Sequence, residues 1–451
     1  MNEKEQEERV KYMTTAPVEK LVCKLAVPTI ISMLVTSFYN MADTYFVGKL
    51  STSATAAVGV VFSAMAFIQA LGFFFGHGSG NYISRKMGAG EYEAASVMAS
   101  TGFVCAFLCG ILVAGVGFLF LEPLSYLLGA TPTILPYTKD YLKVILLGAP
   151  FMTSSLVLNN QLRYQGSAAY AMVGIVTGAA INIALDPLLI FQFHMGVMGA
   201  AVATVASQII SFCLLWAGSR RGGNIVIHLC KFSADRYHIG EILRGGLPSL
   251  CRQGLASISV ACLNQAAGVY GDAAIAGMSI VNRITMFANS ALIGFGQGFQ
   301  PVCGMNYGAG KVKRVRDAYF FCVKNAAVFL VLAAVPGFLG ARWIVSLFRK
   351  EDLEVIEIGT LALRMQILTF PLGAWIVMCN MMLQAIGRSA RASIVAAGRQ
   401  GLFFLPLIVI LPGLFGLTGV QMCQAVADVC ALILSVFLGV GVLQEMKESS
   451  Q

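Results

Sequence analysis

Charged residues are scarce in this chain of 451 residues, and Asp, Glu, Lys and Arg together make up only 12% of it. A soluble protein of this size would have about 25%. Hydrophobic residues make up 57% of the chain, and its mean hydropathy is +0.76. Apolar runs of roughly 20 residues, long enough to cross a bilayer as a helix, recur along the sequence. The short alternating segments of about 10 residues that build a transmembrane β-barrel are lacking. The sequence therefore predicts an all-α polytopic membrane protein.

Patterns that carry catalytic or metal chemistry are also lacking. The 12 cysteines are scattered, with no CxxC pair and no cluster with histidine, which is typical of packing residues. No metal-spaced His/Asp set and no Ser/His or Cys/His pair falls at a common depth. We therefore predict no enzyme activity, no cofactor and no resident metal.

The chain also lacks the marks of secretion and of nucleic-acid binding. The N-terminal stretch MNEKEQEERVKY has no short apolar core with a cleavage site, so no secretory signal peptide is predicted. The net charge is +9, but the basic residues fall in predicted loops, as in membrane proteins generally. No nucleic-acid partner is expected.

About twelve apolar segments are present. We predict spans at roughly 25–48, 54–84, 95–120, 134–160, 166–192, 196–217, 245–269, 274–306, 317–341, 355–385, 390–411 and 415–442. The polar stretch 218–244 is predicted to link an N-lobe (25–217) to a C-lobe (245–442), flanked by terminal segments 1–24 and 443–451. Loops rich in Lys and Arg alternate with nearly uncharged ones, which predicts that both termini are cytoplasmic. The loop at 342–354 breaks this pattern, since it carries charges of both signs.

The two predicted lobes repeat each other at a shift of 220 residues. Pro28 returns as Pro248, and the triplet Gly88-Ala89-Gly90 returns as Gly308-Ala309-Gly310. An even number of spans in two matching halves indicates parallel repeats about an axis along the membrane normal, an arrangement found in transporters.

Polar residues inside the spans do not follow the repeat. Asp43 falls opposite a leucine, Asn182 opposite another leucine, and Asp186 opposite a proline. An ionised carboxylate at mid-bilayer depth costs at least ~2.5–3.5 kcal/mol, so such residues tend to mark ion paths. Asn40 lies on the same helix face as Asp43, and Asn182 on the same face as Asp186. With Tyr39, Asn159, Asn160 and Thr204, these residues are predicted to form one buried polar cluster.

Such a cluster has chemistry suited to ion exchange. Burial disfavours the charged form of a carboxylate, so a proton could be taken up on one side and released on the other. The oxygens of Asp43, Asn182, Asp186 and Thr204 could instead hold Na⁺. The alternative is that both acids only cap or join helices through hydrogen bonds.

The C-lobe has polar residues of another kind. Candidates for a substrate cavity are Arg252, Gln253, Arg283, Gln297, Gln300 and Asp428. The arginines could equally line a wet cavity or tie helix ends, and Asp428 could bind a cationic substrate or pair with a nearby arginine. His77, near the end of its span, is predicted to be a packing or capping residue.

Three segments resemble signatures of the MATE (multidrug and toxic compound extrusion) transporter family. They are Tyr39-Asn40-Met41-Ala42-Asp43, the stretch 182–191 that reads NIALDPLLIF, and the stretch 296–309 that reads GQGFQPVCGMNYGA. The resemblance covers essentially the whole chain and is greatest to MepA-like members, near the DinF branch. It implies a MOP-type fold of two six-helix bundles, V-shaped around a central cavity.

The resemblance also implies a function and site residues. It implies export of bulky, often cationic compounds from a bacterial cell across its plasma membrane, driven by H⁺ or Na⁺, with H⁺ favoured. The DinF-branch ion site matches Asp43, Asn159, Asn182, Asp186 and Thr204, whereas the acids of the NorM branch have no match in the seventh and tenth spans. Small molecules, the coupling ion and membrane lipids are the expected partners of a monomer. A flippase for lipid-linked saccharides or peptidoglycan precursors is the alternative.

Overall fold

The computed structural model describes residues 3–348 and 352–448, and nearly all of them are helical, with no strand in those ranges. In the N-lobe the spans are α2 (Val18–Gly48), α3 (Thr52–Gly88), α4 (Tyr92–Leu119), α6 (Leu135–Tyr164), α7 (Ala168–Pro187) and α8 (Gly196–Ser219). In the C-lobe they are α9 (Arg236–Gly268), α10 (Asp272–Gly308), α11 (Val312–Leu339), α13 with α14 (Leu353–Thr369, Gly373–Ala385), α15 with α16 (Ser389–Ala397, Phe404–Phe415) and α17 (Leu417–Glu448). The predicted all-α membrane fold is confirmed.

Ten helices of the described ranges are long and apolar enough to cross a membrane. The other two predicted spans are α9 and α10, which are as long but more polar. Both helices lie where the two lobes meet. Short helices α1 (Glu3–Thr15), α5 (Leu121–Leu127) and α12 (Ala341–Phe348) complete the chain.

Three helices extend beyond the predicted spans. Helix α2 begins at Val18 rather than at 25, and α9 begins at Arg236, inside the predicted linker 218–244. Helix α17 reaches Glu448 rather than 442. In each case charged residues extend the helix beyond its apolar part, where hydropathy gives no signal. Residues 1–2 and 449–451 of the predicted terminal segments, and 349–351 of the loop with mixed charges, lie outside the described ranges.

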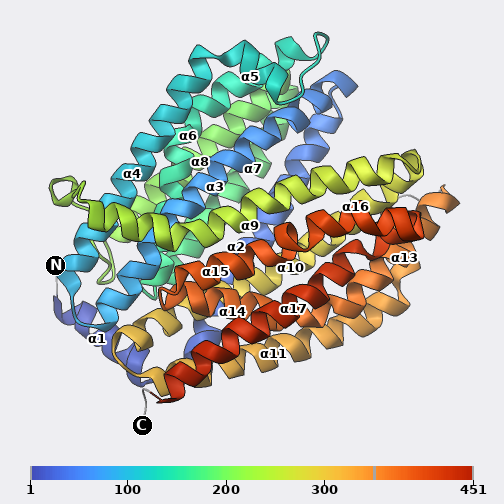
Figure 1. Ribbon diagram of the computed structural model, residues 1–451. Helices are drawn as coiled ribbons and strands as arrows, with labels where there is room; N and C mark the ends of the chain where they lie inside the picture. Colours follow the sequence, from blue (N-terminus) through green and yellow to red (C-terminus); the bar gives the residue numbers. More distant parts are fainter. Residues whose placement is uncertain (1–2, 349–351, 449–451) are drawn as a thin grey trace.

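The two bundles form a V. Figure 1 shows them together at the end that carries both termini and diverging toward the opposite end, where α5 and α16 lie. We call the first of these the terminal end. Helix α2 packs along α10, and α3 packs along both α9 and α10, so the lobes meet through the first two spans of each repeat.

The closest approach between the lobes is the crossing of α3 and α10, and it is symmetric. A Cβ on Gly88 would collide with the carbonyl oxygen of Met305, and a Cβ on Gly308 would collide with that of Arg85. Both pairs are related by the same shift of 220 residues. The repeated glycines therefore allow backbone to meet backbone where the lobes join.

Candidate functional site

The polar cluster of the N-lobe lies between α2, α7 and α8. Asn182 and Asp186 on α7 and Thr204 on α8 are all buried, and Asn182 Nδ2 donates to Thr204 Oγ1 over 3.4 Å. Asp43 on α2 lies close enough to Asp186 for their charges to repel each other. The structure thus brings together both acids that the repeat leaves unmatched.

The oxygens of this cluster are short of partners. Among the described residues, neither carboxylate oxygen of Asp186 has a hydrogen-bond partner, and the same holds for Asp43 Oδ1 and Asn182 Oδ1. A buried polar oxygen without a partner costs free energy, and a buried charge costs more. These oxygens suit a proton or a hard monovalent cation such as Na⁺, which prefers oxygen ligands. The alternative, that the acids only cap or join helices, requires each carboxylate to accept a hydrogen bond from another helix. Within the described ranges, Asp186 accepts no such bond.

Local structure presents the Asp186 carboxylate in an interrupted helix. Pro187 ends α7 and cannot donate a backbone hydrogen bond. The chain continues as a π-helical turn, Leu188–Gln192. Such turns are rare and frequent at functional sites. The second lobe has a π-helical turn as well, Gly398–Leu402, but no acid precedes it there.

Two tyrosines adjoin the acids. Tyr39 on α2 is buried beside Asp43 and Asp186, as predicted for its place in the cluster. Tyr141 on α6 is fully buried and lies near Asp43, Asp186 and Thr204, yet the sequence did not single it out. Its signal was weak, since it lies six residues inside a span with a lysine and an aspartate beside it. Asn40 is half-buried on α2.

Asn159 lies away from this cluster. It follows Tyr141 by 18 residues on α6, which is about 27 Å along a helix. Its Nδ2 donates to the carbonyl of Ala171 at 3.0 Å, and Asn380 in the C-lobe makes the same bond to Ala392 at 2.7 Å. The Asn159 contact therefore belongs to the scaffold that both lobes share.

The C-lobe candidates differ in burial and in partners. Gln297 and Gln300 are buried where the lobes meet, and Gln300 donates to Gln384 over 3.3 Å. Arg252 donates to Asn380 over 3.2 Å, whereas Gln253 is half-buried and Arg283 is exposed. Arg252 also lies near Arg163, which donates to Gln297, so Arg252 and Gln297 adjoin the same buried region.

Asp428 pairs with an arginine, one of the two alternatives drawn from the sequence. Arg399 Nε lies 2.7 Å from Asp428 Oδ1, and both side chains are largely buried. Gln424 Nε2 donates to the same carboxylate at 2.9 Å. Arg399 was missed, although it is the one charged residue in the middle of the predicted span 390–411.

Comparison with known proteins identifies the fold family. The MatE family model matches residues 28–188 and again 248–410, one copy in each lobe. The chain belongs to the MatE family. It is 29% identical over 429 residues, 94% of either chain, to the multidrug export protein MepA of Staphylococcus aureus. It is 28% identical over 435 residues to MepA of Staphylococcus haemolyticus, covering 96% of this chain and 95% of that one.

Solved structures agree with this MatE assignment. One, described as the outward-facing conformation of a multidrug resistance MATE family transporter of the MOP superfamily, has a TM-score of 0.91 at 28% identity and covers 97% of this chain and 98% of its own. Another, a MOP superfamily transporter from Pyrococcus furiosus described as having a binding pocket of reverse polarity, has a TM-score of 0.90 at 28% identity with the same coverage. The protein is a multi-pass membrane transporter and not an enzyme.

The MatE lobes are joined at the terminal end by a buried network. Arg163 on α6 donates to Gln297 on α10 and to Asn160 Oδ1, and its Nη2 lies 3.2 Å from His77 Nε2. The other ring nitrogen of His77 lies 2.8 Å from the hydroxyl of Ser249 on α9. His77 is 1% exposed, in keeping with the predicted packing role.

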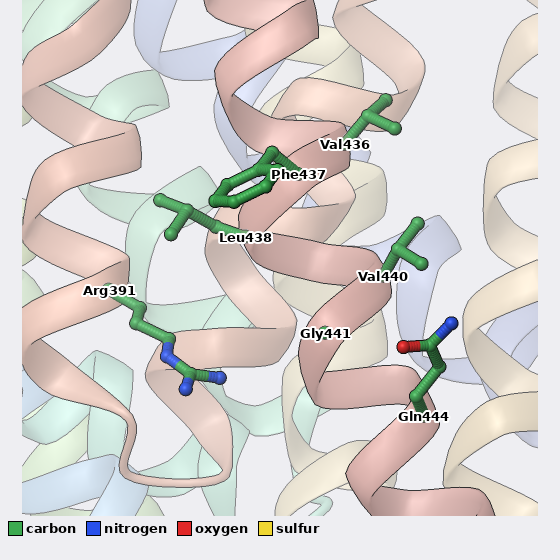
Figure 2. A pocket seen from close by; sticks show the side chains of 7 residues that line it. All are labelled: Arg391, Val436, Phe437, Leu438, Val440, Gly441 and Gln444. Carbon is green, nitrogen blue, oxygen red and sulfur yellow. The ribbon is translucent and has the colours of Figure 1, made fainter.

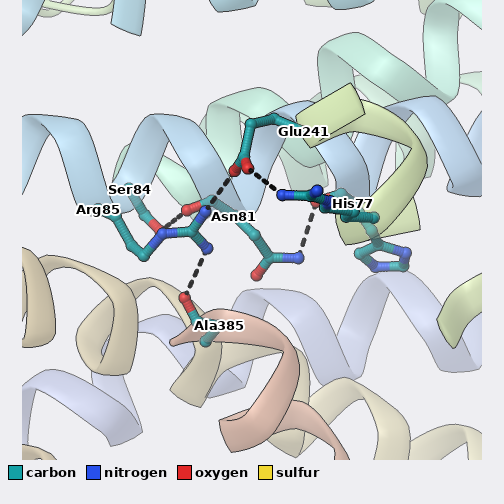
Figure 3. Close-up of polar contacts among 7 residues, drawn as sticks. His77, Asn81, Ser84, Arg85, Glu241 and Ala385 are labelled. Carbon is teal, nitrogen blue, oxygen red and sulfur yellow. Dashed lines mark hydrogen bonds and ion pairs between the residues drawn. The ribbon is translucent and has the colours of Figure 1, made fainter. Parts of the chain in front are cut away.

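An ion pair closes the same end of the MatE transporter. Arg85 of α3 lies 3.3 Å from Glu241 of α9 and donates to the carbonyl of Ala385 on α14 at 3.1 Å (Figure 3). These contacts cross from the N-lobe to the C-lobe. In this structure the lobes are therefore held together at the terminal end.

Helix α1 forms a further bridge there. Arg9 donates to Asn224 Oδ1 of the linker at 2.6 Å, and the same oxygen accepts from Ser167 of the N-lobe. On the C-lobe side, Asn306, Lys311 and Arg314 donate to backbone carbonyls between Met13 and Ala16, at 3.1, 2.9 and 2.5 Å. Helix α1, inside the predicted terminal segment 1–24, is thus a strap across both lobes.

Proposed function

We propose that this protein exports bulky, often cationic, hydrophobic compounds across the bacterial plasma membrane in exchange for an inward-moving ion. The relatives named as multidrug export proteins cover nearly the whole chain, which supports the export function. The positive charge of the loops at the terminal end supports an orientation with both termini in the cytoplasm.

The observation that carries the ion coupling is the set of unpartnered oxygens on Asp43, Asn182 and Asp186. Two acids whose charges repel each other are stabilised together when one of them binds a proton, or when a cation lies between them. Either event changes the contacts between α2 and α7. Because α2 also packs along α10 of the other lobe, a movement of α2 on ion binding in the N-lobe also changes the packing between the lobes.

Proteoliposomes test this proposal directly. A fluorescent organic cation would be the reporter of transport, driven by an imposed pH gradient in one sample and by an imposed Na⁺ gradient in another. We favour H⁺, so transport is expected with the pH gradient. Asp43→Asn should abolish driven transport while the protein still inserts. Asp317→Asn, which removes an exposed acid on α11, is the matched control and should transport normally. Full transport by Asp43→Asn would refute the coupling.

A further inference from the structure

A groove lies on the outer face of the C-lobe between α15 and α17. Its volume is about 490 Å³, and its lining includes Arg391, Val436, Phe437, Val440 and Gln444 (Figure 2). It lies toward the terminal end, because α15 begins there and α17 ends there. Nothing in the export mechanism uses this groove.

The walls of the groove suit an acyl chain. Phe437 is 79% exposed, and Val436 and Val440 are each 37% exposed on a helix apolar enough to cross the membrane. Gly441 deepens the groove, since a Cβ built there would have no atom within 4 Å. An apolar channel that faces the bilayer is filled by the apolar chains around it.

The end of the groove nearest the termini is positively charged. Arg391 and Arg388 both pair with Glu445, at 3.1 and 2.9 Å, so two guanidinium groups share one carboxylate. One net positive charge is left, and both arginines are partly exposed, at 36% and 50%. Basic pockets beside membrane helices are recognised by anionic lipid headgroups.

We propose that this groove binds a phospholipid with an anionic headgroup. One acyl chain would lie along Phe437, Val440 and Gly441, and the headgroup phosphate would face Arg391 and Gln444. A zwitterionic lipid would fit the apolar walls but would bring no net charge to the arginines. Inorganic phosphate would meet the arginines but not the walls. The proposal is independent of the export function.

Native mass spectrometry of the purified full-length protein tests the proposal. The protein would be mixed with equal amounts of phosphatidylglycerol and phosphatidylcholine, and the retained lipid would be counted. We expect one phosphatidylglycerol retained in preference to phosphatidylcholine. Arg391→Gln should lower its occupancy about five-fold, the factor for losing one basic residue near an anionic group. Gly441→Leu should lower it at least as much by filling the groove.

Two matched variants control for charge and for bulk. Arg220→Gln removes an exposed arginine stacked on Trp216 of the N-lobe, and Gly115→Leu fills open space on α4. Both should retain the lipid as the wild type does. Equal retention of the two lipids by the wild type would overturn the proposal, and so would unchanged retention in Gly441→Leu. Displacement by millimolar inorganic phosphate would identify a site for free anions, which also overturns it.

Discussion

Asp43 and Asp186 differ in how they are held. Asp186 is fully buried on a helix that is interrupted at the next residue, whereas Asp43 is only half-buried on a continuous helix. Asp43 is therefore the more accessible of the two acids. An ion that enters would meet Asp43 first and would be shared with Asp186 second.

Tyr141 is expected to tune this site. Tyr141→Phe keeps the buried ring and removes a hydroxyl near Thr204 and both acids. A lost hydrogen bond of about 1 kcal/mol corresponds to roughly a five-fold change in an equilibrium constant. The ion concentration for half-maximal transport should rise by that factor, measured in proteoliposomes at saturating dye. Tyr126→Phe, on the exposed helix α5, should change nothing. Identical ion dependence in Tyr141→Phe would place its hydroxyl outside the site.

The Arg399–Asp428 pair should act on stability. Asp428→Leu leaves a buried guanidinium without its carboxylate, which costs about 3–5 kcal/mol. The thermal unfolding temperature in detergent should fall clearly. Adding Arg399→Met should restore most of it, because the unpaired charge is gone. If Asp428 instead binds substrate, the double variant would be stable yet inactive, and its transport assay distinguishes the two roles.

Some residues of the polar cluster could be predicted from the sequence, and others could not. Asp43, Asn182 and Asp186 were predicted because each breaks the repeat, and burial inside an apolar span made each costly. Asn159 lies apart because periodicity gives a helix face but not a depth along it. Tyr141 and Arg399 were missed because the contacts that define them come from other helices.

At the scale of elements, hydropathy locates the apolar part of each helix but not its ends. Helix α9 extends from Arg236 through a stretch that its charges make look like a linker. Helix α1 has no apolar signal, since it is rich in glutamate, and it meets the C-lobe through its own backbone carbonyls, which accept hydrogen bonds from Asn306 and Lys311. Both become visible only through their contacts with the other lobe.

Removing α1 should loosen the terminal end. Deletion of residues 3–15 removes the bond of Arg9 to Asn224 and the bonds that Asn306 and Lys311 make to the carbonyls of α1. Cys303 on α10 is fully buried next to the helix crossing, so it reports on this end when kept as the sole cysteine. Its labelling by a water-soluble maleimide should become several-fold faster after the deletion. Cys423, buried within the C-lobe, should stay protected as a sole cysteine. Unchanged labelling of Cys303 would mean that α1 does not hold the lobes.

For the whole molecule, the repeat predicted two lobes, and the structure adds where they join. The glycines that form this joint were visible in the sequence as part of the repeat. The sequence did not show which helix of the other lobe each glycine contacts. Gly88 of the N-lobe faces the backbone of α10, and Gly308 of the C-lobe faces the backbone of α3. That pairing depends on the rotation between the lobes, which no local pattern encodes.

Rotation of one lobe against the other can be stopped with a cross-link. The hydroxyl oxygens of Ser37 on α2 and Ser290 on α10 lie 2.9 Å apart, and the two helices belong to different lobes. In a background without other cysteines, Ser37→Cys with Ser290→Cys should form a disulfide on oxidation. Transport should stop and should return on reduction, whereas either single cysteine should be unaffected. Normal transport in the oxidised double variant would show that α2 and α10 stay together throughout the cycle.

The glycine crossing also bears on how such a fold diversifies. Its contacts are between backbones, so they persist whatever side chains each half acquires elsewhere. A duplicated gene can then lose its acids in one copy, or gain an internal ion pair such as Arg399 with Asp428, while the halves still dock. Substitutions can therefore change the transported compound and the coupling ion without disturbing the α3–α10 crossing, because the glycines at that crossing have no side chains.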